Sequence, residues 1–216
     1  MKSIFFICIL FVSSAFTAQS SGAFLGSNQL LENGSFSSLN SHFGNIKAKG
    51  SSLMFKDFNN QAILTLTSGE TYSISNINLN LDKGNFVAEI GKDSLFIFNN
   101  VKKAIINNKK YTQINNSIYQ ILESGKNISF LIKHTKVIKR QVQNKLSAEE
   151  LKWKHNEDYY VKINNKLEEI NLKKKDFFNY LDANNIKNLK AFIKSNRLKV
   201  KKEKDLITIL KHYNTL

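Results

Sequence analysis

The sequence predicts an α+β protein: an antiparallel curved β-sheet or open barrel-like meander capped by three short C-terminal helices. Between residues 52 and 138, short runs alternate apolar and polar side chains and are separated by turns such as Ser68-Gly69 and Asn107-Asn108, which is typical of β-hairpins. Between residues 171 and 216, apolar residues recur at helical spacing. We therefore divide the chain into a signal peptide (1–20), a lead-in (21–50), an antiparallel β domain (51–170) and a helical cap (171–216).

The first twenty residues have the pattern of a secretory signal. Lys2 precedes an apolar run from Ile4 to Val12, and small polar residues follow up to Ser20. This predicts cleavage near Ser20, with Ala15 as the alternative, and an exported protein that is periplasmic or secreted. Cys8 is the single cysteine and lies in the apolar run, so disulfides and thiolate chemistry are not expected after cleavage. The sequence shows no further stretch long enough to cross a membrane as a helix.

The lead-in is rich in Gly, Ser and Asn, and its apolar residues follow no clear period. It is interpreted as a flexible mature N-terminus or, alternatively, as an arm that binds a partner.

The β domain is built from consecutive hairpins. Near Asn76 the alternation shifts by one residue, which predicts a β-bulge. We expect the concave side of the sheet to receive the helices. Residues 140–156 are interpreted as a surface loop, with Trp153 either tucked against the sheet edge or part of a contact site. The expected strands cover residues 52–58, 62–67, 72–74, 77–81, 86–90, 94–98, 101–106, 110–114, 118–122, 128–138 and 159–163.

The tail has three amphipathic stripes, each typical of a short helix. Asn184 or Asn185 can cap the second helix, and Glu203 with Asp205 suits the positive end of the third. The tail has too few apolar residues to fold alone, so we expect it to pack on the β domain. The stripes are Phe177, Phe178 and Leu181; Ile186, Leu189, Phe192 and Ile193; and Leu206, Ile207, Leu210 and Tyr213.

The chain carries a formal net charge of +15. Such a charge favours anionic partners, although a chain rich in Lys, Asn and Ile without Pro is also what compositional drift in an AT-rich genome produces. Lysines of the tail form a candidate anion-docking face, with an ordinary solvated face as the alternative. They are Lys173, Lys174, Lys175, Lys187, Lys190, Lys194, Lys201, Lys202 and Lys204.

The sequence predicts no catalytic residue, metal site or cofactor. Its four histidines, His42, His134, His155 and His212, do not show the spacing of a metal-binding motif, and surface positions are expected for them. Adjacent carboxylates such as Glu157-Asp158 point to opposite faces of a strand and do not form a pair.

From Gly50 onward, the chain resembles a family of exported proteins common in Bacteroidota, flavobacteria in particular. The opening Gly50-Ser51-Ser52-Leu53 is similar to the family's start, although it lacks the family's proline. In the tail, the segments 158–162, 191–200 and 205–214 are similar to a paired-Tyr strand and two helical motifs. Asn76-Ile77-Asn78-Leu79 departs from the family's Tyr-Asn pair. The resemblance implies an exported protein with β-hairpins and a helical tail, and it implies no activity.

These observations favour a non-enzymatic envelope protein that binds a partner protein. The alternative is a periplasmic protein that binds lipid, lipopolysaccharide or an anionic glycan, and a hydrolase is the third possibility. An apolar cleft rimmed by lysines would favour lipid, and converging His, Asp and Ser side chains would favour a hydrolase. Nucleic acid is not an expected partner, since no recognised nucleic-acid module is present.

Overall fold

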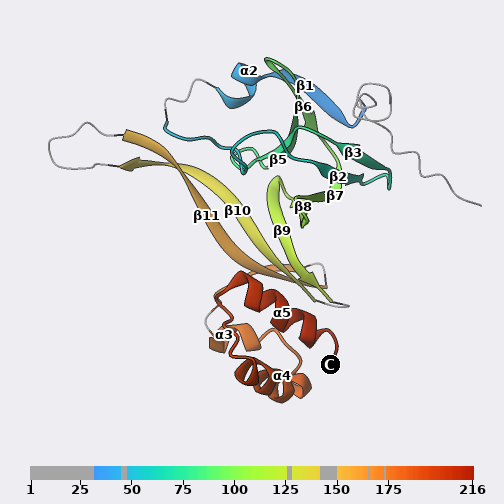
Figure 1. The fold of residues 1–216 in the computed structure, drawn as a ribbon, viewed down its shortest axis with the longest axis vertical. Coiled ribbons are helices and arrows are strands. Elements are labelled where there is room, and N and C mark those ends of the chain that lie inside the picture. Colours follow the sequence, from blue (N-terminus) through green and yellow to red (C-terminus); the bar gives the residue numbers. More distant parts are fainter. Residues whose placement is uncertain (1–31, 45–47, 126–127, 142–149, 165, 173) are drawn as a thin grey trace, which may run out of the picture.

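The computed structural model describes residues 32–44, 48–125, 128–141, 150–164, 166–172 and 174–216. Its strands form two antiparallel sheets with a few helices, so the predicted class is confirmed in outline (Figure 1). The prediction of one continuous sheet is wrong, because the chain moves between two sheets. The elements are β1 (Gly34–Ser38), α2 (Leu39–Phe43), β2 (Ala62–Leu66), β3 (Thr71–Ile74), β4 (Ile77–Asn80), β5 (Asn85–Gly91), β6 (Ser94–Phe98), β7 (Val101–Ile106), β8 (Lys109–Ile114), β9 (Ser117–Ser124), β10 (Ile128–Gln141), β11 (Glu150–Ile163), β12 (Lys166–Ile170), α3 (Lys174–Phe178), α4 (Ala183–Ser195) and α5 (Glu203–Tyr213).

The smaller sheet has the strand order β1-β6-β5-β4. Its edge strand β1 comes from the segment expected to be a flexible lead-in, and it pairs with β6 from Gly34 opposite Phe98 to Ser38 opposite Ser94. For residues 34–43 the expectation of a flexible lead-in is therefore wrong, while residues 21–31 lie outside the described part. The reason is that pairing with β6 gives the backbone of this polar segment its hydrogen-bond partners.

The larger sheet has the order β12-β11-β10-β9-β8-β7-β2-β3, so its strands from β7 to β12 follow one another as a meander. Its tight hairpins turn at asparagines with positive φ, including Asn107 (49°) and Asn108 (63°) between β7 and β8. Asn tolerates this left-handed conformation better than most residues. The predicted hairpins over 101–114 and 118–138 are confirmed.

The chain crosses between the sheets near residue 76. Asn76 has a φ of 56° and lies in the turn between β3 of the larger sheet and β4 of the smaller one, where a β-bulge was expected.

Residues 52–58, expected to be a strand, form bends with one β-bridge between Leu53 and Asn80. The fully buried Asn78 holds this segment, since its Nδ2 donates to the carbonyls of Phe55 (3.1 Å) and Asp57 (2.7 Å).

A second contact joins the two sheets at Gly84, in the turn between β4 and β5. Gly84 has a φ of 66°, and a Cβ at this position would lie 1.8 Å from the carbonyl oxygen of Asn116 in the turn between β8 and β9. The carbonyl of Gly84 also accepts a hydrogen bond from Gln113 Nε2 at 2.6 Å. Only a residue without a side chain allows this approach.

The strands β10 and β11 form a long hairpin paired from Ile128 opposite Ile163 to Gln141 opposite Glu150 (Figure 1). The interpretation of residues 140–156 as a surface loop is therefore wrong for residues 150–156, which belong to β11. Alternation of side chains along this stretch is weak because both of its faces carry polar and charged residues, so the strand signal is lost in the sequence.

One face of the larger sheet covers two hydrophobic cores. The first core lies between the two sheets and includes Ile118, which is opposite His134. The second lies between β9–β12 and the helices and includes Ile132, two residues before His134 on the same face. The three helices are therefore packed at the end of the larger sheet away from the smaller sheet, and they do not fill a single concave side (Figure 1).

The predicted helices are confirmed as α3, α4 and α5. The cap of α4 is Asp182, whose side chain accepts from the backbone N–H of Asn184 at 3.0 Å, so the prediction that Asn184 or Asn185 is the cap is wrong. Glu203 and Asp205 lie in the first turn of α5, as expected. None of the helices in the described ranges is long and apolar enough to span a bilayer.

Candidate metal centre

Neighbouring strands of the larger sheet each place a polar side chain on the face that covers the two cores. Tyr111 of β8 is opposite Gln120 of β9, and His134 of β10 is opposite Glu157 of β11. His155 shares the face of Glu157 because it lies two residues earlier on the same strand. These side chains lie at the junction of the two hydrophobic cores.

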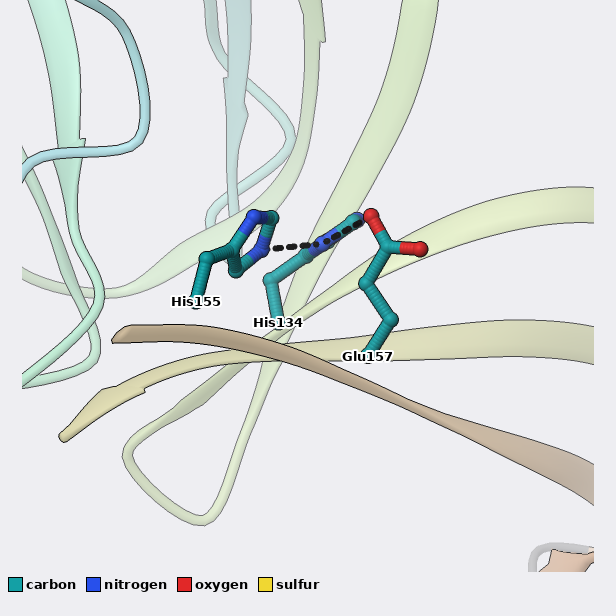
Figure 2. Close-up of side chains that lie close together, drawn as sticks. All are labelled: His134, His155 and Glu157. Carbon is teal, nitrogen blue, oxygen red and sulfur yellow. Dashed lines mark hydrogen bonds and ion pairs between the residues drawn. The ribbon is translucent and has the colours of Figure 1, made fainter.

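Three of these side chains converge (Figure 2). His134 Nδ1 lies 3.1 Å from His155 Nε2 and 3.7 Å from Glu157 Oε1, and the three ligand atoms all lie within 4.8 Å of one another. We call His134, His155 and Glu157 the His-His-Glu cluster. His134 is buried, whereas His155 and Glu157 are exposed, so the cluster is reached from solvent on the β11 side.

A chain of hydrogen bonds supports the cluster from its buried side. His134 Nε2 lies 3.2 Å from Oε1 of Gln120. Gln120 Nε2 donates to Oε1 of Glu203 in α5 at 2.9 Å, and Lys109 Nζ donates to the same oxygen at 3.2 Å. The polar chain thus extends from the sheet to the first turn of the last helix.

The surroundings keep His134 in its neutral form. Burial, followed by the nearby His155 and Lys109, lowers the pKa of His134 to about 4, while the Glu203 carboxylate opposes this shift. Burial also lowers the pKa of His155, although the Glu157 carboxylate opposes this shift. Both imidazoles are therefore neutral at pH 7, which is the form that binds a metal ion.

The cluster has the composition and spacing of a metal site. Two ligand atoms bound to one Zn²⁺ at 2.0–2.1 Å in a tetrahedral arrangement lie about 3.3 Å apart. The two separations that involve His134, 3.1 and 3.7 Å, lie on either side of this value, and the His155 and Glu157 ligand atoms lie within 4.8 Å of each other. Two imidazoles and one carboxylate suit Zn²⁺, and three protein ligands leave a fourth position for water or another donor.

Tyr111 lies beside the cluster and is fully buried, with its ring centroid 6.4 Å from that of His134. Its hydroxyl has no hydrogen-bond partner among the described residues. Burial raises the pKa of this hydroxyl, and the carboxylates of Glu203 and Glu157 raise it further. The phenol therefore keeps its proton at neutral pH and can donate a hydrogen bond.

An open pocket of about 620 Å³ adjoins the cluster and shares Glu157 with it. Three carboxylates line this pocket beside one lysine and a few apolar side chains. It is not the apolar, lysine-rimmed cleft that the lipid-binding alternative requires. Its lining includes Glu157, Asp158, Glu169, Lys201, Ile170 and Leu172.

The predicted lysine face is only partly within the described residues. Lys173 and the side chains of Lys174 and Lys175 lie outside them. Lys190 extends over the ring of Phe178, with Nζ 4.9 Å from the ring centroid, so its side chain also covers the second core. The exposed members are Lys187, Lys190, Lys194, Lys201, Lys202 and Lys204.

Trp153 lies within β11, opposite Ile138 of β10, and it is half-buried. Its backbone N–H donates to the carbonyl of Lys49 at 3.0 Å. These observations place the Trp153 backbone within the sheet, and both interpretations of its side chain, at the sheet edge or in a contact site, stay predictions.

The expectation that each histidine lies on the surface is wrong for His42 and His134, which are buried. The histidine spacing in the sequence also did not reveal the His-His-Glu cluster, because its members meet through strand pairing. A signal was present: His155 and Glu157 are two residues apart in a strand, and the β10–β11 register places His134 opposite Glu157. Recognising this signal requires knowing that β11 begins at Glu150, in a stretch whose sequence is typical of a surface loop.

Comparisons with protein-family models, with curated proteins and with solved structures found no match to this chain. The resemblance to an exported Bacteroidota family, and the export itself, therefore stay predictions.

Proposed function

We propose that this protein binds a divalent transition-metal ion, with Zn²⁺ as the best fit, through His134, His155 and Glu157. One observation carries the proposal: two imidazole nitrogens and a carboxylate oxygen lie within 4.8 Å of one another on one face of a single hairpin. Imidazole ligands favour Zn²⁺, Cu²⁺ and Ni²⁺ over Mg²⁺ and Ca²⁺, which prefer sites made of oxygen atoms.

Calorimetric titration of the chelator-treated full chain with Zn²⁺ tests this proposal. We expect one ion per chain, no heat with Mg²⁺, and loss of binding in the His155→Gln variant. His212→Gln is the matched control, because His212 stacks on Phe192 at 3.8 Å between ring centroids and lies outside the cluster. Zinc binding that survives in His155→Gln would show that the ion binds elsewhere.

Metal binding needs no catalytic step, so it fits the expected non-enzymatic protein of the envelope. That location and the partner protein remain proposals. Their support is the signal-like first twenty residues, and their test is recovery of a single envelope protein with the tagged chain after crosslinking.

Anion docking is a second candidate function, supported by the exposed lysines of α4 and α5. Sedimentation with vesicles tests it, using phosphatidylglycerol vesicles against neutral phosphatidylcholine vesicles. We expect binding only to the anionic vesicles, weakened by salt and by the double substitution Lys187→Gln with Lys194→Gln. The control pair is Lys139→Gln with Lys152→Gln on the β10–β11 hairpin, and equal loss in both pairs would argue for a diffuse charge effect.

A further inference from the structure

The orientation of the buried Gln120 amide is fixed by its partners. Gln120 is 3% exposed and lies between His134 and Glu203. A carboxylate can only accept hydrogen bonds, so the amide nitrogen of Gln120 must face Glu203. Lys109 Nζ, 3.2 Å from the same carboxylate oxygen, holds Glu203 as the charged acceptor. The amide oxygen of Gln120 therefore faces His134.

This orientation decides which nitrogen of His134 carries the proton. An amide oxygen also only accepts, and His134 Nε2 lies 3.2 Å from it, so Nε2 carries the hydrogen. A neutral imidazole has one N–H, and Nδ1 is left with its lone pair. Nδ1 is the atom that faces His155 and Glu157.

We propose that Gln120 and Glu203 are positioning residues of the metal site. They hold His134 in the tautomer that presents Nδ1 to the ion. Metal ligands of this kind commonly donate their second ring N–H to a carbonyl or carboxylate oxygen, which fixes the ring and raises its basicity. This inference rests on the proposed metal binding, and it makes the first turn of α5 part of the site although Glu203 is 46 positions after Glu157 in the sequence.

A purely structural role is the competing explanation for the same contacts. Gln120 and His134 are buried polar groups between two apolar cores, and they need hydrogen bonds whether or not an ion binds. In that case the pair would stabilise the fold and fix the same tautomer, but the affinity for a metal ion would not depend on it. The experiment therefore has to follow the tautomer and the affinity separately from stability.

The tautomer can be measured in the metal-free chain by NMR of labelled histidine. We expect the N–H of His134 on Nε2 in the wild-type chain. Gln120→Met removes the acceptor at nearly constant volume, and Nδ1–H can then donate toward Glu157. We expect the proton of His134 to move at least partly to Nδ1 in this variant.

The affinity for Zn²⁺ is measured on the same proteins by competition with a chelator. Gln120→Met should weaken Zn²⁺ binding by about 10- to 100-fold, the usual effect of losing such a partner. The double substitution Gln120→Glu with Glu203→Gln should restore most of the affinity. The new carboxylate accepts from both His134 and the new amide, whose oxygen can still accept from Lys109.

The control Gln113→Met removes a glutamine of the adjacent strand that hydrogen-bonds Gly84 and not His134. It should change neither the tautomer nor the affinity. A wild-type N–H on Nδ1 overturns the inference, as does unchanged zinc affinity in Gln120→Met. If the wild-type chain binds no zinc, the proposed function fails together with this inference. If the wild-type chain binds zinc and Gln120→Met binds it equally well, only this inference fails.

Discussion

His134 and Glu157 face each other across β10 and β11, with His134 Nδ1 3.7 Å from Glu157 Oε1. The histidine is almost fully buried, whereas 45% of the Glu157 side chain is exposed. The pair therefore joins the core to solvent, and it provides one nitrogen and one oxygen of the proposed metal site from two directly paired residues.

Substitution Glu157→Gln should weaken zinc binding, because a neutral amide is a poorer ligand than a carboxylate. Loss of a residue that only supports a ligand typically lowers metal affinity by about 10- to 100-fold. The loss of zinc affinity in Glu157→Gln, measured by chelator competition, should be larger than this. Glu169→Gln is the control, since Glu169 shares the adjoining pocket and is not in the cluster. An equal loss in both variants would mean that the acidic pocket, and not the cluster, attracts the ion.

The metal-free protein should lose stability in acid because His134 is buried as a neutral imidazole. Its folded pKa is about 4, below the usual 6.5, so the unfolded chain binds the proton first as the pH falls. The free energy of unfolding should drop between pH 6.5 and 4 by about 3 kcal/mol from this residue. Above pH 7, protonation of His134 should change the free energy of unfolding little.

Urea unfolding at pH 7.5, 5.5 and 4.0 measures this loss. The variant His134→Gln should show a shallower decline than the wild-type chain. The lowered pKa of His42 acts in the same direction, so only the difference between the two proteins reports on His134. Parallel declines in the two proteins would contradict the prediction.

Asn78→Leu should destabilise the fold by releasing residues 52–58, which lie along β4 of the smaller sheet. Asn78 is fully buried, and its side chain also accepts from the backbone N–H of Phe55 at 3.0 Å. Each buried backbone group left unpaired costs about 1–3 kcal/mol. Asn59→Ala, at an exposed neighbouring position, should change the unfolding free energy much less in the same urea titration. A small effect of Asn78→Leu would show that water or rearrangement replaces these bonds.

Gly84→Ala should be more harmful than Gly69→Ala, although both glycines have positive φ. At Gly69 (φ 100°) an added Cβ meets nothing within 4 Å, so only backbone strain of about 1–2 kcal/mol is expected. At Gly84 the added Cβ would overlap the carbonyl of Asn116 and separate the two sheets. Thermal unfolding compares the two variants, and equal shifts of Tm would show that the contact between the turns yields easily.

The sequence by itself determined the local elements of this protein. Hairpins at Asn107-Asn108 follow from the tolerance of Asn for positive φ, and the three tail helices follow from apolar stripes at helical spacing. Such features depend on residues a few positions apart, so a single chain displays them. The failures at residues 34–38 and 150–156 occurred where polar strands gain their order from a neighbouring strand.

Only the tertiary structure decided how these elements combine. The division into two sheets depends on which strands pair with one another. The residues of the turn at Asn76 do not show that β3 and β4, on either side of it, belong to different sheets. The meeting of His134 with His155 depends on hairpin register, and the contact of Gln120 with Glu203 spans 83 positions. Contacts between residues this far apart in the sequence form when distant apolar faces bury one another. That packing, and not local sequence spacing, decides which polar side chains meet at the junction of the two cores.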